Sequence, residues 1–114
     1  MTQTYKDLIV WQKSLELVVE VYRLTDKFPK EEVYGITSQI RRCAVSIPSN
    51  IAEGKLRDYS KEFKRFLLIA FGSGGELETQ IEISKRLNKT KDLDYTKVDS
   101  LLNEVMKMLN KMIS

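Results

Sequence analysis

The side chains that could carry out catalysis are few and form no recognisable constellation. The chain has no histidine, so the commonest general base and the commonest metal ligand are both missing. The single cysteine, Cys43, falls on the apolar side of an expected helix, where a packed thiol is the better interpretation. Ser46 and Ser49 lack a triad partner, and nothing marks a serine–lysine pair. We therefore expect a protein that is not an enzyme and has no cofactor.

Two other patterns resemble ligand sites only superficially. The glycine-rich run at residues 72–75 lacks the lysine and hydroxyl of a phosphate-binding loop and does not follow a strand. We expect these glycines to let a neighbouring helix approach closely. Glu76, Glu78 and Glu82 could suggest a carboxylate metal site, but such sites in bundles also use a Glu-x-x-His element. Solvated or ion-paired glutamates, and no bound metal, are the expectation.

Basic residues concentrate between positions 41 and 65. This segment has seven basic and three acidic residues, a net charge of +4, whereas the whole chain carries +3. Such an excess can bind phosphates, although it is as often a solvated helix face. Tyr59, Phe63 and Phe66 lie among these charges, and their spacing places them on the core side. The candidate nucleic-acid-binding residues are Arg41, Arg42, Lys55, Arg57, Lys61, Lys64 and Arg65.

A second basic group closes the third expected helix, where positive charge also suits the helix dipole. It consists of Lys85, Arg86, Lys89 and Lys91.

The elements that must position these residues are predicted to be helices. Apolar residues recur with helical spacing along the chain, and no stretch shows the alternation of apolar and polar residues that is typical of a strand. We predict one domain over residues 1–114, with helices at about 7–28, 34–54, 60–87 and 94–112. The short connections favour an up-down antiparallel four-helix bundle. Pro48 predicts a kink in the second helix. Gly54 is expected to end that helix, Ser60 to cap the third, and Thr96 with Asp99 to form a capping box.

The first helix carries more apolar surface than one bundle needs. One stripe contains Leu8, Trp11, Leu15, Val18 and Tyr22, and a second contains Val10, Leu17, Val21, Leu24 and Phe28. The two stripes lie about 120° apart around the helix. Since a bundle core needs one stripe, the surplus predicts self-association. The candidate interface residues are Val10, Leu17, Val21, Leu24, Leu68 and Ile69.

The start of the chain shows no signal-peptide pattern, and the longest apolar run, residues 66–71, is too short to cross a bilayer. These features predict a cytoplasmic protein without a membrane partner. The lone cysteine is consistent with a reducing compartment.

Three segments, at residues 7–13, 38–54 and 62–78, carry a family resemblance. They resemble the 23S rRNA-intervening-sequence protein family, and the likeness covers nearly the whole chain. The resemblance implies a four-helix bundle that assembles into a ring-like homopentamer. The family name refers to reading frames inside insertions in bacterial 23S rRNA genes and establishes no activity. A similar group, the accessory proteins of diversity-generating retroelements, binds a reverse transcriptase and its nucleic acid through a basic surface.

The most specific part of the resemblance includes Ser46, Pro48, Asn50 and Glu53, for which the family implies no agreed role. Cys43 stands where alanine is usual, and the Gly74-Gly75 pair is unusually glycine-rich. Both departures could alter helix contacts.

The hypothesis from sequence is a non-enzymatic homo-oligomer that binds RNA or a ribonucleoprotein through its basic segments. The alternative is a protein-interaction scaffold with no nucleic-acid role. An enzyme would need a carboxylate or lysine site that the sequence does not reveal.

Overall fold

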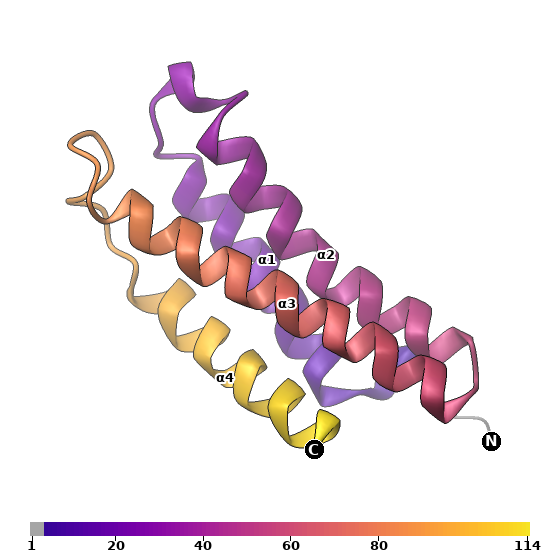
Figure 1. Cartoon of the computed structure of the whole chain (residues 1–114). Coiled ribbons are helices and arrows are strands. Elements are labelled where there is room, and N and C mark those ends of the chain that lie inside the picture. Colours follow the sequence, from indigo (N-terminus) through magenta and orange to yellow (C-terminus); the bar gives the residue numbers. More distant parts are fainter. Residues whose placement is uncertain (1–3) are drawn as a thin grey trace.

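The structure, a computed structural model, describes residues 4–114 (Figure 1). Within this part the chain is all-α and has four long helices and no strand. The long helices are α1 (Ile9–Thr25), α2 (Ile36–Leu56), α3 (Ser60–Ser84) and α4 (Thr96–Ile113). Two short 3-10 helices, η1 (Tyr5–Asp7) and η2 (Lys30–Glu32), precede α1 and α2.

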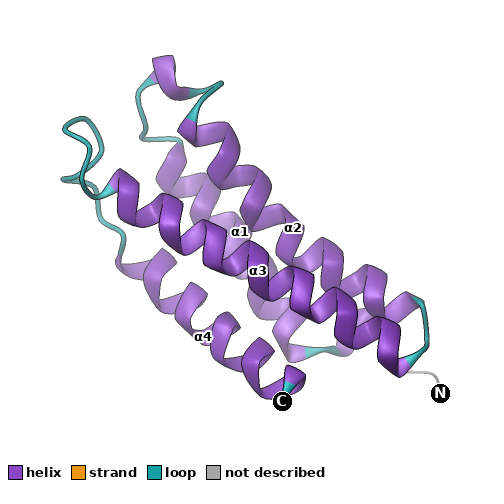
Figure 2. Ribbon diagram, in the orientation of Figure 1, coloured by secondary structure: helices purple, strands orange, loops and turns teal. Residues whose placement is uncertain are grey.

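The four helices form an elongated bundle in which helices consecutive in sequence are neighbours (Figure 2). α1 packs against α2 and α4, and α3 packs against the same two helices. The body measures 49 × 23 × 22 Å. A helix of the length of α3 spans about 38 Å, so the helices run along the long axis of the molecule.

The predicted helix bounds agree with the observed ones to within three residues, but several of the predicted caps are wrong. Ser60 is the first residue of α3, and its predecessor Tyr59 makes no side-chain cap bond. Thr96 likewise begins α4 and does not form the expected box with Asp99. Instead, the carboxylate of Asp94 accepts a hydrogen bond of 3.0 Å from the Thr96 amide. A capping box is present at Thr4, which the sequence analysis missed.

Gly54 does not end α2, because the helix continues to Leu56. It lies at a close approach of α2 to α3, where a Cβ atom on Gly54 would sit 2.6 Å from the Cβ of Phe66. Gly74 of α3 is comparable, since its Cβ would sit 2.2 Å from Sδ of Met106 on α4. The prediction that glycines admit a neighbouring helix therefore holds at Gly74. It fails at Gly72 and Gly75, where a Cβ would meet nothing within 4 Å.

The core corrects the predicted oligomer interface. Val10, Leu17, Val21 and Leu24 all face the inside of the bundle and are at most 5% exposed. Their assignment to a contact with another copy is wrong, because a side chain that is buried inside one chain has no accessible surface left to contact a second chain. Helical periodicity identified both stripes of α1 correctly but could not say which one faced the other three helices.

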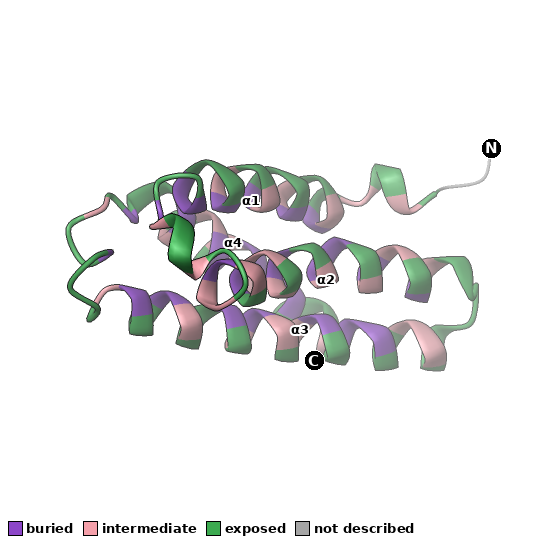
Figure 3. Ribbon diagram, turned by 90° about the horizontal axis from the view of Figure 1, so that it is seen from above, coloured by how far each residue is buried: buried purple, intermediate pink, exposed green. Residues whose placement is uncertain are grey.

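The stripe of α1 that remains outside is the other one. Leu15 is 38% and Tyr22 40% exposed, and Val19, which is 48% exposed, lies beside them. Ile9, which is 59% exposed, points to a different side of the helix. The outward side of α1 is visibly exposed in Figure 3, whereas its inward side is buried. Leu68 and Ile69 of α3, the remaining two candidate interface residues, are 49% and 41% exposed. Apolar surface is therefore left on two faces of the bundle.

Among the described residues, no helix combines the length and apolar character required to cross a membrane.

Candidate nucleic-acid interface

The turn between α2 and α3 positions most of the candidate basic residues. Only three residues separate Leu56, the last of α2, from Ser60, the first of α3. The reversal uses a left-handed backbone at Asp58, with φ of 50°, a conformation that aspartate tolerates better than most residues. The turn lies at one end of the bundle and is exposed (Figure 3). Basic side chains from both helices therefore meet at this end.

We call the five basic residues around this turn the turn cluster. Its members are Lys55, Arg57, Lys61, Lys64 and Arg65.

Two guanidinium groups of the turn cluster bracket one buried ring. Cζ of Arg57 lies 5.2 Å, and Cζ of Arg65 4.5 Å, from the centroid of the Phe66 ring. Nζ of Lys55 similarly lies 5.6 Å from the centroid of Phe63. Stacking on aromatic faces leaves cations accessible while it restricts their side-chain freedom.

Some of these cations are already paired with carboxylates. Nη2 of Arg57 lies 3.1 Å from Oε1 of Glu53, and Nε of Arg65 donates to Oε2 of Glu62 at 2.7 Å. The bond from Arg65 lowers the pKa of the Glu62 carboxyl. Such exposed pairs are worth at most about 1 kcal/mol and exchange readily for another anion. Lys61 and Lys64 are exposed and form no ion pair within residues 4–114.

An aromatic ring also stands open at the turn. Tyr59 is 61% exposed, which contradicts the prediction that it faces the core. The reason is its place before α3, where its extended backbone, with φ of −148°, takes it out of the helical stripe. Phe66 is buried as predicted, and Phe63 is half-buried. An exposed ring in a turn whose flanking residues include lysines has the composition of a platform on which a base can stack.

Arg41 and Arg42 lie elsewhere. Along α2, Arg42 is about 20 Å from Lys55, so the seven candidate residues do not form one surface. Arg41 is tied to α1, because its Nε donates to Oγ1 of Thr25 at 2.8 Å and its Nη2 to Oδ1 of Asp26 at 2.9 Å. Its Cζ also lies 4.5 Å from the centroid of the Tyr22 ring. Arg41 is thus a structural residue, whereas Arg42 is exposed.

The second basic group is similarly occupied in part. Nζ of Lys85 donates to Oδ2 of Asp99 on α4 at 2.7 Å, and this bond raises the pKa of the lysine. Nζ of Lys89 lies 3.1 Å from Oε1 of Glu31 in η2. These contacts join the loop after α3 to its neighbours, so this group is a weaker candidate for phosphate than the turn cluster.

The motif of unknown role has structural contacts along α2. The hydroxyls of Ser46 and Ser73 are hydrogen-bonded to each other across α2 and α3. Nδ2 of Asn50 donates to the carbonyl oxygen of Ser46 at 2.8 Å, and Pro48 is buried. With Glu53 paired to Arg57, each of the four motif residues has a place in the packing of α2. The serine pair between helices could not be found from sequence spacing alone.

Cys43 is poorly suited to act as a nucleophile. Burial raises the pKa of its thiol, and the nearby Glu76 carboxylate, with Oε2 3.9 Å from the sulfur, raises it further. A thiol in such a setting retains its proton at neutral pH. In the described part of the chain, no group of three or more cysteine, aspartate or glutamate side chains is arranged to hold a metal ion.

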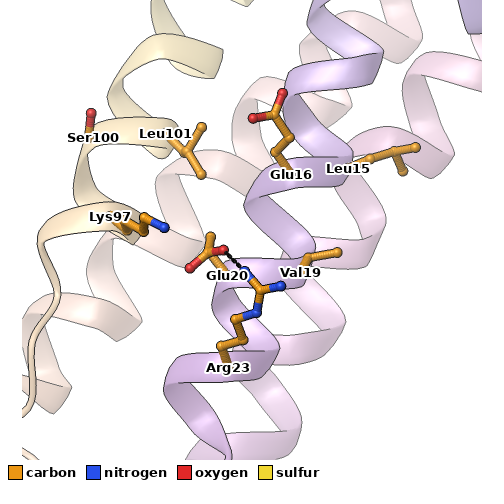
Figure 4. A pocket seen from close by; sticks show the side chains of 8 residues that line it. All are labelled: Leu15, Glu16, Val19, Glu20, Arg23, Lys97, Ser100 and Leu101. Atoms are coloured by element: carbon orange, nitrogen blue, oxygen red, sulfur yellow. Dashed lines mark hydrogen bonds and ion pairs between the residues drawn. The ribbon is translucent and has the colours of Figure 1, made fainter.

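A hollow of about 580 Å³ opens between α1 and α4 (Figure 4). Its apolar walls come from Leu15, Val19 and Leu101, and the carboxylate of Glu20 is paired with the guanidinium of Arg23 along its edge. The remaining lining residues are Glu16, Lys97 and Ser100. Its charged groups have mixed signs, so it shows no preference for an anion.

Four long helices, with no strand in the described residues, define the class as a small all-α four-helix protein. The comparison with known families gives the membership. The model of the 23S rRNA-intervening sequence protein family matches residues 6–111, which is nearly the whole chain. The chain belongs to this family, as the sequence resemblance predicted. No curated protein matches the chain.

Proposed function

We propose that this protein is a non-enzymatic homo-oligomer that binds structured RNA, or a ribonucleoprotein, through the turn cluster. The observation that carries the proposal is the exposed Tyr59 ring in the turn that joins α2 and α3, whose adjoining ends carry the basic residues of the turn cluster. Lys61 and Lys64 supply charge for phosphates, and Tyr59 supplies a face for an unstacked base.

The exposed apolar residues support self-association. Several large apolar side chains are exposed on the same two helices, including Ile9 and Val19 on α1 and Leu68 and Ile69 on α3. Clusters of exposed apolar residues are typical of interaction surfaces, whereas single ones are not. We include four further features in the same proposal. They are the five-subunit ring implied by the resemblance, the up-down antiparallel order of the helices, a kink in α2 at Pro48 and a cytoplasmic location.

RNA binding is tested by filter binding of the purified protein to a structured RNA with a single-stranded loop, over a series of salt concentrations. Replacing Lys61 and Lys64 together with glutamate should weaken binding and reduce the slope of log K against log salt by about 1.5. Tyr59→Ala should weaken binding by about tenfold, with the salt slope unchanged.

The matched control replaces Lys107 and Lys111, two exposed lysines of α4, with glutamate. This variant has the same net charge as the lysine variant of the turn cluster. Equal loss of binding in both variants would show that only net charge matters and would refute the turn cluster as the site. Undetectable binding at low salt would refute an RNA ligand altogether.

A protein-interaction scaffold is the second candidate function, and the hollow between α1 and α4 favours it. Apolar walls with a polar edge suit a protein side chain better than a phosphate. A partner protein that stays bound after nuclease treatment, and is lost when Val19 is replaced by glutamate, would support this candidate over RNA binding.

A further inference from the structure

One face of α3 is largely exposed, mostly apolar and low in charge. We call it the α3 outer face. At 100° per residue its members fall within a sector of about 120° and extend over four turns of the helix. They are Leu68, Ile69, Gly72, Gly75, Glu76, Thr79 and Ile83, and Glu76, beside Cys43 of α2, is the single charged member. Leu68, Ile69 and Ile83 are each more than two-fifths exposed.

The two glycines of this face have no explanation within the chain. A Cβ atom at Gly72 or at Gly75 would meet nothing within 4 Å. Glycine in a helix interior nevertheless lowers helix stability by about 1 kcal/mol relative to alanine. The Thr79 hydroxyl donates to the Gly75 carbonyl oxygen at 2.9 Å, so it needs no external partner, and its polarity is satisfied within the helix.

Charge divides along α3 on either side of these glycines. The first half has Lys61, Lys64 and Arg65, with Glu62 as its single acidic residue. The second half has Glu76, Glu78 and Glu82 and no basic residue before Lys85. A helix that is basic at one end and acidic at the other is complementary to an antiparallel copy of itself.

We propose that two copies of the chain pack their α3 outer faces together, antiparallel, and cross at Gly72 and Gly75. The contact is isologous, so each basic half lies along the acidic half of the other copy. It deepens the self-association proposed above and rests on it, because it names the surface and the symmetry of one contact.

The geometry of the helix supports this register. Arg65 lies about 10 Å along the axis from Gly72, and Glu82 lies about 10 Å from Gly75 on the other side. Around the helix, Arg65 and Glu82 lie about 50° to either side of the line between the glycines. Arg65 of one copy therefore reaches Glu82 of the other, twice in each pair, when the two helices cross at an angle that tilts these edges toward each other. The absence of Cβ atoms lets the two backbones approach closely, and Leu68, Ile69 and Ile83 then flank the crossing.

The contact makes a prediction about subunit number. A two-fold contact joins chains in pairs. A ring of five chains, held together by the exposed apolar residues of α1, would therefore pair with a second ring to give a particle of ten chains. Light scattering coupled to size exclusion, over a concentration series of the full chain, should therefore show an even-numbered species that dissociates on dilution.

Charge reversal tests the register. Arg65→Glu alone and Glu82→Arg alone each place like charges together twice, and each should weaken the pairing by about tenfold at low salt. An equimolar mixture of these two variants should pair as tightly as the wild type, because every contact in the mixed pair again joins opposite charges. Gly72→Leu should abolish pairing. Circular dichroism shows whether each variant is folded, and Leu56→Ala, at an exposed site away from this face, is the control.

The outcomes separate this contact from the proposed function. A particle of five chains alone, unaffected by Gly72→Leu, would overturn the α3 contact and leave self-association intact. Failure of the mixed variants to restore pairing would also overturn it. A monomer at every concentration would overturn both.

Discussion

Gly54 and Gly74 differ from Gly72 and Gly75 although all four lie inside helices. The first two glycines face a neighbouring helix at a distance that a Cβ atom would not fit, against Phe66 and Met106. The other two face open space, within three residues of Gly74 on the same helix. Because a glycine inside a helix is unfavourable by itself, the first pair is explained by packing inside the bundle. The second pair indicates a surface whose purpose lies outside the single chain.

Glycines that are adjacent in the sequence serve different surfaces of α3. Residues 72–75 form one glycine-rich segment in the sequence, yet the 100° rotation between successive residues sends its members to different surfaces. One glycine of the run determines how closely α4 approaches α3, and the other two leave the opposite side of α3 flat.

The largest effect on stability is expected from Gly54→Ala. Its Cβ would lie 2.6 Å from the Cβ of Phe66, an atom fixed to the α3 backbone, so the two helices must move apart. Overpacking of this kind costs about 1–3 kcal/mol, which exceeds the gain in helix propensity. Chemical denaturation should show a loss of about 2 kcal/mol. A variant as stable as the wild type would mean that α2 and α3 are less tightly packed than the structure shows.

Replacing Gly72 and Gly75 together by alanine should increase the stability of the chain, in contrast to Gly54→Ala. Neither new methyl group would meet another atom of the chain, and each removes the entropic cost of a helical glycine. The unfolding free energy of the isolated chain should rise by about 1–2 kcal/mol, measured at a concentration where it is monomeric. At higher concentration the same variant should associate more weakly. Destabilisation of the monomer would contradict the distinction between the two pairs.

A smaller change is expected from Gly74→Ala. The nearest atom, Sδ of Met106 at 2.2 Å, belongs to a flexible side chain that can move away. The packing cost and the helix-propensity gain should nearly cancel, leaving a loss below about 1 kcal/mol. Replacing Met106 by alanine in the same chain should make the Gly74 substitution favourable. A double-mutant cycle measures this coupling.

The smallest effect concerns Cys43, which lies on α2 beside Glu76 of α3. Its pKa in the folded chain is raised above the ordinary value of 9.0, first by burial and then by the Glu76 charge. The resulting stabilisation is complete at neutral pH and is lost as the pH rises from the unfolded toward the folded pKa. Above pH 9, the wild type should therefore lose slightly more stability than Cys43→Ala. Equal pH dependence of the two denaturation midpoints would contradict this prediction.

The alkylation rate of Cys43 links this prediction to the glycine comparison. Because the thiolate is the reactive form, iodoacetamide should react slowly at pH 8 with the folded wild type. Gly54→Ala, which separates α2 from α3, should accelerate the reaction, whereas the Gly72 and Gly75 alanine variant should not.

The fold was largely predictable because long amphipathic helices leave a strong periodic signal. Ile40, Ala44, Ile47 and Ile51 are buried on α2 as their spacing predicts. The candidate site was predicted less well. Arg41 and Lys55 belong to one basic segment of the sequence, but the rise of the helix separates them in space. Tyr59 was assigned to the core because the helical stripe was extended one residue beyond the start of α3.

The sequence by itself determined the number of helices, their approximate bounds and the surplus of apolar surface on α1, since these depend on local periodicity. Only the tertiary structure decided which stripe of α1 is covered. Val10 and Leu17 are chemically similar to Leu15 and Val19, and they differ in the side of the helix on which they lie. It also decided that Gly54 and Gly74 face partners while Gly72 and Gly75 do not. The physical reason is the same in each case: burial depends on where the neighbouring helices stand, and a helix cannot encode that position in its own repeat.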